Sequence, residues 1–220
     1  MKGLLGLLRQ SPALRVEGEA AESELFSTAF ADQGVEAAML VPWEARANEV
    51  GARRLPAARG GKALKLLWRQ DKTMARLASD AAASRLERFF DFASLPASRD
   101  VIRQGEYSNF MVVLLSGTIA VDREQATGKR LRLSQARPGD ILGEMSLLDS
   151  GRRLSVCTSL SECDIAVLSA QALDEMMASD PALAASLVAV LARKLSRRLR
   201  VVSTRLSEKK ADAVLHHRLG

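Results

Sequence analysis

The sequence predicts a mainly β domain with flanking helices, an α+β fold organised around a small sandwich or barrel. Between residues 101 and 168, short β-prone runs alternate with turn signals about every dozen residues, which is typical of antiparallel β folds. A zone rich in Ala, Leu and Arg precedes these runs, and a long helical pattern follows them. With 47% hydrophobic residues among 220, the chain can bury the core of one domain and carry an extension.

Residues 1–80 are predicted to form a helical or partly disordered N-terminal extension. Prolines and glycines interrupt its short amphipathic patches, and isolated helices of that length are stable only when they dock on a surface. A helix is then expected over residues 80–92, where an apolar stripe includes Phe90. Leu95-Pro96 is expected to end this helix, because the residue before a proline is pushed out of the helical region.

The central zone, residues 81–180, is expected to hold the β domain and its flanking helices. Glycines at strand ends, such as Gly105, Gly117 and Gly139, suit tight corners that other residues reach only with strain. The β-prone runs lie at residues 101–102, 110–115, 118–121, 131–133, 141–142, 154–158 and 164–168.

Residues 181–220 are predicted to form a long C-terminal helix and tail, after a short helix over residues 170–178. Asp180-Pro181 supplies an N-cap followed by a proline at the first helical position. An apolar stripe then continues for about 30 residues, or roughly 45 Å. Its members are Leu183, Leu187, Leu191, Leu195, Leu199, Val202 and Leu206. The same helix of a second copy is the expected partner, which predicts a homodimer; the alternative is a helix folded back on its own barrel or N-terminal segment.

The distribution of charge leaves one further class of partner open. The net charge is +6, and between Arg193 and Lys210 eight basic residues stand against one acid, Glu208. A solvated helix face explains this run best, and a nucleic-acid binder that uses the same helix is the alternative. Specific DNA binding by this chain alone is not expected, because residues 209–220 are too short for a helix-turn-helix.

Several functional classes find no support in the sequence. The two cysteines, Cys157 and Cys163, and the histidines His216 and His217 lack the spacing of a zinc site, so no metal site is expected. The motifs of P-loop NTPases, serine hydrolases and zinc proteases are absent, which predicts a protein without catalytic residues. No apolar run of about 18 residues occurs, so we expect no membrane span and a cytoplasmic protein.

Three stretches of the central zone resemble one known family. Residues 95–106 resemble its first strands, residues 111–121 its central hairpin, and residues 138–153 its phosphate-binding cassette. The family is that of cyclic-nucleotide-binding domains, which includes the bacterial catabolite activator and the regulatory subunits of cAMP-dependent kinase. The resemblance covers a little over half of the chain and implies a jelly-roll β-barrel followed by a long C-terminal helix.

The resemblance places a ligand site on the cassette. Gly143 leads into a short helical turn whose free backbone N–H groups suit a phosphate. Arg153 is by resemblance the phosphate arginine, and a guanidinium can donate to two phosphate oxygens at once. Glu144 is by resemblance the acceptor of a hydrogen bond from the ribose 2′-hydroxyl. Met145, the next residue of the cassette, is also expected among the ligand contacts.

Three neighbouring positions leave the details of phosphate binding open. Leu154 stands where many members carry a Ser or Thr whose hydroxyl touches the phosphate, and the lost bond contributes about 0.5–3 kcal/mol. Ser155 compensates if the strand is shifted by one residue, so both are counted among the ligand contacts. Arg152 is the alternative to Arg153 as the arginine that enters the site, because the two are adjacent.

The contact to the purine base is expected from the C-terminal helix. An ungapped alignment from the start of that helix brings Arg198 and Leu199 to the family's base-covering position. Ser203 and Thr204 lie about one turn later and are better hydrogen-bonding partners for an adenine. Both positions stay open.

The sequence therefore predicts a sensor module that binds a cyclic nucleotide, cAMP before cGMP, without a cofactor. Occupancy is expected to pass through the C-terminal helix to an unidentified protein partner. Two alternatives use the same fold. One is a degenerate domain kept for dimerisation and protein contacts, and the other is a transcription-regulator-like protein without its own DNA-binding domain.

Overall fold

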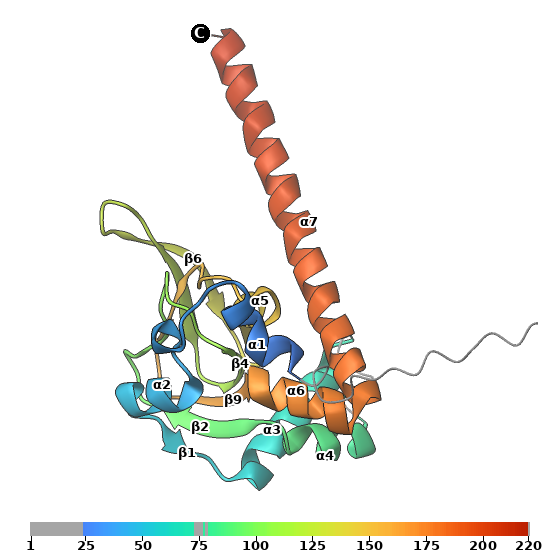
Figure 1. Cartoon of the computed structure of the whole chain (residues 1–220). Helices are drawn as coiled ribbons and strands as arrows, with labels where there is room; N and C mark the ends of the chain where they lie inside the picture. The colour runs from blue at the N-terminus through green and yellow to red at the C-terminus, as the bar shows by residue number, and fades with distance from the viewer. Residues whose placement is uncertain (1–23, 73–76, 78, 220) are drawn as a thin grey trace, which may run out of the picture.

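The structure is a computed structural model that describes residues 24–72, 77 and 79–219 (Figure 1). Its strands form two sheets, and every pair of neighbouring strands is antiparallel. The first sheet holds, in order, β1 (Arg53–Arg54), β2 (Asp91–Leu95), β9 (Cys163–Ser169), β4 (Phe110–Ser116) and β7 (Ile141–Leu142). The second holds β3 (Asp100–Ile102), β8 (Val156–Ser159), β5 (Ile119–Glu124) and β6 (Arg130–Ala136). The predicted mainly β fold with flanking helices is confirmed.

Strand β4 shows how the sequence builds two hydrophobic cores. It lies between β9 and β7, so its side chains point alternately to the two faces of the first sheet. Met111 and Val113 pack toward the helices, whereas Phe110 and Val112 pack toward the second sheet. Because both faces are covered, the strand is a continuous apolar run rather than an alternating one.

The helices that pack on the first of these cores include α3 (Ala57–Gln70), α4 (Asp80–Glu87), α6 (Ala170–Ser179) and the first turns of α7 (Pro181–Leu219). Trp68 of α3 is 1% exposed and meets Phe90 edge-on, with 6.0 Å between the ring centroids. Gly60 allows α3 to approach the sheet, since a Cβ at this position would lie 2.2 Å from the ring of Phe92.

The N-terminal segment consists of α1 (Leu25–Asp32), a 3₁₀ turn (Ala37–Met39) and α2 (Trp43–Val50). Asp174 of α6 caps α1, because its carboxylate accepts from the backbone N–H groups of Phe26 at 2.9 Å and Ser27 at 2.8 Å. Gln33 donates to the carbonyl oxygen of Asp149, at the end of α5 (Glu144–Asp149), at 2.9 Å. The segment is thus held at α6 and at α5. The division of the chain at residues 80 and 180 stays a prediction.

The helix expected over residues 80–92 was predicted too long. Helix α4 ends at Glu87, and residues 91–95 form strand β2 instead. These residues pair with β9 from Asp91 to Leu95, and their side chains alternate between the two cores, with Phe92 on the helical side. A strand pairing at long range therefore overrides the local helical pattern.

Helix α7 begins at Pro181 as predicted, and Asp180 Oδ1 accepts from the backbone N–H of Leu183 at 3.3 Å. The apolar stripe is buried at its start and exposed farther along: Leu191 is 0% exposed, whereas Leu199 is 70% exposed. Figure 1 shows the helix leaving the body of the domain. The side chain of Leu206 lies outside the described residues. No helix in the described ranges is long and apolar enough to cross a membrane.

Candidate functional site

A cavity of about 110 Å³ lies where β7 runs into α5, opposite the start of β8 and one face of α7. It brings together residues that are far apart in the sequence. Its lining residues are Ile102, Val121, Leu142, Gly143, Glu144, Met145, Ser146, Arg153, Leu154, Ser155, Cys157 and Arg198. Seven of the nine predicted ligand contacts are in this set, namely Gly143, Glu144, Met145, Arg153, Leu154, Ser155 and Arg198.

Gly143 forms the corner between β7 and α5. Its φ of +78° lies in the left-handed region, which a residue with a side chain adopts only with strain. A Cβ on Gly143 would also lie 2.3 Å from Nη1 of Arg153 and 2.9 Å from Cδ1 of Ile102. The corner therefore requires glycine for two reasons: its positive φ, and the space that the Arg153 guanidinium occupies beside it.

Arg153 is buried beneath this corner and is 3% exposed. Its Nε donates to Ser108 Oγ at 2.6 Å, and its two terminal nitrogens donate to the carbonyl oxygens of Gly143 and Phe110. These bonds use three of the five N–H donors of the guanidinium. Burial lowers the pKa of Arg153 to about 10, which leaves the group cationic at neutral pH. The arginine therefore joins the cassette to β4 and to the loop before it.

Arg152 lies outside the cavity. Its Nη1 donates to the carbonyl oxygen of Gly105 at 2.9 Å, and its guanidinium stacks on Tyr107 at 4.5 Å from the ring centroid. Of the two adjacent arginines, the structure thus places Arg153 in the lining and Arg152 on the surface.

Glu144 is the acidic group of the cavity and is 3% exposed. Arg198 of α7 covers it, with Nη1 donating to Glu144 Oε1 and Nη2 donating to the carbonyl oxygen of Ile141 at 3.0 Å. Burial raises the pKa of Glu144, while Arg198, its own backbone N–H, Arg153 and Lys194 act in the opposite direction. The carboxylate faces the cavity under an arginine from the long helix.

The rest of the lining is mostly apolar. Met145 is 42% exposed and Leu154 53% exposed, so both form the open rim. Cys157 lies deeper, and burial raises the pKa of its thiol to about 12, so the thiol is neutral and acts as an apolar wall. Leu199 and Ser203 were expected at the site but do not line the cavity, because both side chains are exposed on α7.

Sequence reasoning missed Ser108 and Phe110, which hold the guanidinium of Arg153. It also missed Ile102 and Val121 in the cavity wall. For Val121 a signal existed, since inward and outward side chains alternate along β5. For Ser108 none existed, because its partner is 45 residues away.

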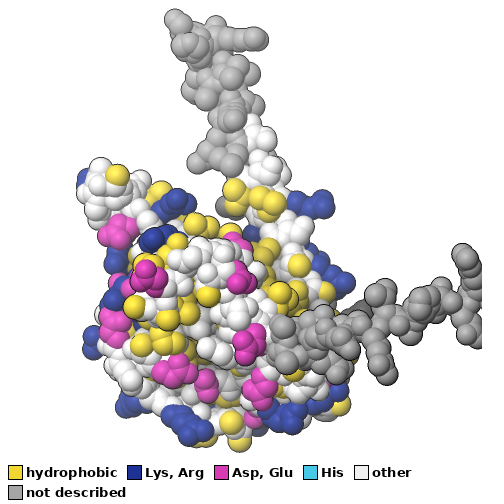
Figure 2. All heavy atoms as spheres, viewed as in Figure 1, with side chains coloured by type: hydrophobic (Ala, Val, Ile, Leu, Met, Phe, Trp, Pro, Cys, Tyr) yellow, Lys and Arg dark blue, Asp and Glu magenta, His cyan; other side chains and the backbone are white. Residues whose placement is uncertain are grey.

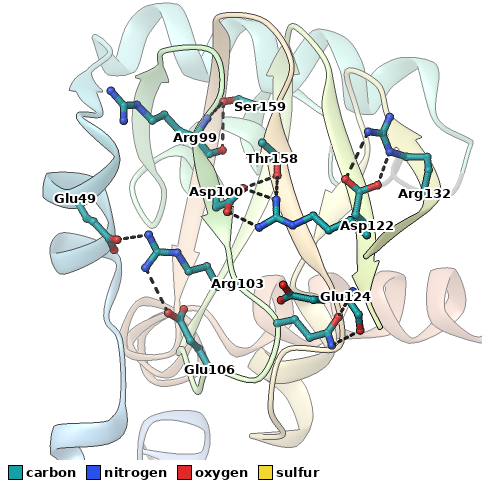
Figure 3. A network of polar contacts seen from close by, with 12 residues as sticks. Glu49, Arg99, Asp100, Arg103, Glu106, Asp122, Glu124, Arg132, Thr158 and Ser159 are labelled. Carbon is teal, nitrogen blue, oxygen red and sulfur yellow. Dashed lines mark hydrogen bonds and ion pairs between the residues drawn. The ribbon is translucent and has the colours of Figure 1, made fainter. Parts of the chain in front are cut away.

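The N-terminal segment supports the loop that pairs with Arg153. Arg46 of α2 is 1% exposed and donates to Glu49 at 2.6 Å and to Glu106. Arg103 also lies between these two carboxylates (Figure 3). The carbonyl oxygen of Glu106 accepts from the backbone N–H of Arg153 at 2.9 Å. A chain of contacts therefore runs from α2 to the backbone of the buried arginine.

The second sheet carries a further polar network on its surface (Figure 3). Asp100 accepts from Arg130 at 3.0 Å and from the hydroxyl of Thr158, and Asp122 pairs with Arg132. Burial acts to raise the pKa of Asp100, but these hydrogen bonds outweigh it and hold the pKa below its ordinary value. The network joins neighbouring strands.

Residues 92–180 match the protein-family model described as the cyclic nucleotide-binding domain, and the cavity-lining part of the cassette falls inside this range. The chain contains a cyclic nucleotide-binding domain. The resemblance seen in the sequence is thereby confirmed. Among the described residues, no group of three or more His, Cys, Asp or Glu side chains could hold a metal ion.

Several curated bacterial proteins are similar to this chain. The CRP-like cAMP-activated global transcriptional regulator of Mycobacterium tuberculosis is 28% identical over 117 residues, 53% of this chain and 52% of that protein. The Cyclic AMP receptor protein of Thermus thermophilus is 27% identical over 107 residues, 49% of this chain and 50% of that protein. The chain thus spans about half the length of these relatives.

Solved structures give the same fold. A cyclic nucleotide-binding domain from Methylobacillus flagellatus superposes with a TM-score of 0.63 at 22% identity, covering 72% of this chain and 89% of that chain. At this identity the likeness concerns the fold, and the chemistry of the cavity rests on its own residues.

Proposed function

We propose that this protein is a regulatory module whose cavity binds a cyclic nucleotide, with cAMP preferred over cGMP. The observation that carries the proposal is the meeting of Gly143, Glu144 and Arg153 in one cavity within the cyclic nucleotide-binding domain. Together they offer a tight backbone corner, a carboxylate and a buried cation. The preference for cAMP rests on the names of the curated relatives, which are cAMP-activated or cAMP receptors.

In this proposal each polar group meets one part of the ligand. The cyclic phosphate pairs with the positive charge of Arg153. It also accepts hydrogen bonds from the guanidinium N–H groups that bind no protein atom among the described residues. The ribose 2′-hydroxyl donates to Glu144, whose two oxygens are both acceptors when the group is ionised. Ser155 offers a hydroxyl that Leu154 lacks, and Met145 gives the sugar an apolar contact. The ligand binds and leaves unchanged, so no catalytic residue and no cofactor are required.

Helix α7 is proposed as the element that transmits occupancy to a protein partner in the cytoplasm. Arg198 already faces the cavity, whereas Leu199 and Ser203 reach a purine only after the helix shifts. A ligand changes the helix position only if it binds one position better, typically by about 1–3 kcal/mol.

Homodimerisation through α7 belongs to the same proposal. Beyond the domain, α7 exposes Leu199, Val201 and Val202 at 70%, 50% and 52%, and Figure 2 shows hydrophobic side chains on this part of the helix. Leu131 of the edge strand β6 is also 52% exposed. We expect light scattering to give twice the chain mass, falling to one chain mass in Leu199→Glu/Val202→Glu. The matched control is Leu66→Glu, on an exposed position of α3.

Calorimetric titration with cAMP and cGMP tests the binding proposal. We expect saturable heat with cAMP, a weaker response with cGMP, and a melting temperature that rises with ligand concentration, since ligand at 100 times Kd stabilises by about 2.7 kcal/mol. The absence of heat and of a thermal shift at millimolar nucleotide would favour the second candidate, a domain kept for dimerisation and protein contacts. Leu154, which provides no hydroxyl for a phosphate, is the observation in favour of that candidate.

A further inference from the structure

Arg198 is placed to control access to the carboxylate of the cavity. Its two terminal nitrogens donate to Glu144 Oε1 and to the carbonyl oxygen of Ile141. Ile141 belongs to β7 and Glu144 to α5, the strand and the helix on either side of Gly143. Arg198 itself stays half in solvent, with 50% of its side chain exposed, while the Glu144 side chain beneath it is 4% exposed. The guanidinium therefore covers the carboxylate.

The cavity is small for the ligand that the proposed function assigns to it. Its volume is about 110 Å³, whereas pockets for small molecules usually measure about 300–1,000 Å³. The ribose hydroxyl would need the same carboxylate that Arg198 holds. A neutral hydroxyl donates a weaker bond to a carboxylate than a guanidinium does. Entry of the nucleotide therefore requires Arg198 to release or share Glu144.

Release of Arg198 would also free α7. Earlier on the helix, Lys194 binds Asp71 at 2.5 Å, and Leu191 is fully buried in the core. Among the side chains that the structure describes beyond Arg198, the hydrogen bonds stay within α7 itself, from Thr204 to Arg200 and from Ser207 to Ser203. Arg198 is thus the outermost described attachment of the helix to the barrel.

We propose that Arg198 is a latch that occupies Glu144 in the empty protein and is displaced when a cyclic nucleotide binds. The inference rests on the proposed function, because it takes Glu144 as the ribose acceptor. Loss of the latch lets the part of α7 beyond Leu195 move, which couples occupancy to the helix. A residue that only read the base would behave in the opposite way, since its removal would weaken binding.

The test compares nucleotide affinity in wild type, Arg198→Leu and Arg200→Leu by calorimetry with cAMP and cGMP. Arg200 is the matched control, because it is an exposed arginine of the same helix and its loss changes the net charge equally. We expect Arg198→Leu to lower the Kd for both nucleotides by roughly fivefold, the scale of a half-exposed ion pair of about 1 kcal/mol. Arg200→Leu is expected to leave the Kd within about twofold.

Hydrogen exchange of α7 supplies a second measurement. In the empty protein, we expect Arg198→Leu to speed amide exchange over residues 195–204 relative to wild type and to Arg200→Leu, and we expect nucleotide to slow this exchange again as Leu199 and Ser203 reach the purine. A Kd that rises in Arg198→Leu, or equals that of Arg200→Leu, would overturn the latch while leaving the proposed binding function in place. If no variant binds either nucleotide, both the latch and the binding function are wrong.

Discussion

Replacement of Gly143 by alanine measures how tightly the cassette corner and Arg153 are fitted together. A residue with a side chain at this positive φ loses roughly 1–2 kcal/mol. The new Cβ would also lie 2.3 Å from Nη1 of Arg153, so the guanidinium must move and release the carbonyl of residue 143. A hydrogen bond from a charged group contributes about 1.5–3 kcal/mol. We therefore expect Gly143→Ala to lower the free energy of unfolding by roughly 2.5–5 kcal/mol.

Gly139→Ala separates the two contributions. Gly139 also has a positive φ, +95°, but an added Cβ meets nothing within 4 Å. Only the backbone term applies there, about 1–2 kcal/mol. Urea unfolding followed by circular dichroism gives both values. Equal losses in the two variants would refute the reasoning, because they would mean that the contact with Arg153 is relieved without consequence.

Three other substitutions test contacts around the site. Arg46→Met should lower the free energy of unfolding by about 1–3 kcal/mol in urea and weaken nucleotide binding, because it removes the buried partner of Glu106 and leaves only the longer pair with Arg103, beside the loop that pairs with Arg153. Asp174→Asn should speed amide exchange in α1, since the carboxylate accepts from two N–H groups with its two oxygens whereas an amide has one acceptor oxygen, with about 1 kcal/mol lost. Asp100→Asn should flatten the fall of the melting temperature in acid. The pKa of Asp100 is lowered in the folded protein, so its stabilisation is present above the ordinary carboxyl pKa and disappears as pH falls through the lowered value.

Matched variants make these outcomes specific. Arg53→Met removes an arginine that is 76% exposed, and it should change stability by less than about 0.5 kcal/mol. Glu175→Gln alters the exposed acid next to Asp174 and should leave exchange in α1 unchanged. An Arg46→Met protein as stable as Arg53→Met would show that α2 does not support the loop. A melting profile of Asp100→Asn parallel to wild type in acid would contradict the assigned cause of the pKa shift.

Much of the fold follows from local patterns. Regular turns and a continuous apolar run at β4 were enough to predict a small β domain, and Asp180-Pro181 gave the start of α7 correctly. The error at residues 88–92 has a physical reason. Leu86, Phe89 and Phe90 form a helical stripe, but the residues from Asp91 onward pair with β9, some 70 residues away in the chain, and this pairing places Phe92 on a strand.

The site was only partly predictable for a related reason. The cassette is a continuous stretch, so Gly143, Glu144 and Arg153 could be grouped from the sequence and do line one cavity. The pairing of Arg198 with Glu144 joins residues 54 positions apart and depends on the direction in which α7 leaves the domain. A sequence pattern determines neither this pairing nor the direction of α7.

The packing of the helices that precede residue 92 bears on where the protein can be divided. A fragment limited to residues 92–180 would lose Trp68 and its neighbours, and it would expose to water the face of β4 that carries Met111 and Val113. A large exposed apolar surface promotes aggregation. The smallest piece expected to fold and remain monodisperse therefore begins near residue 24 and extends past Leu191, about twice the length of the recognised domain.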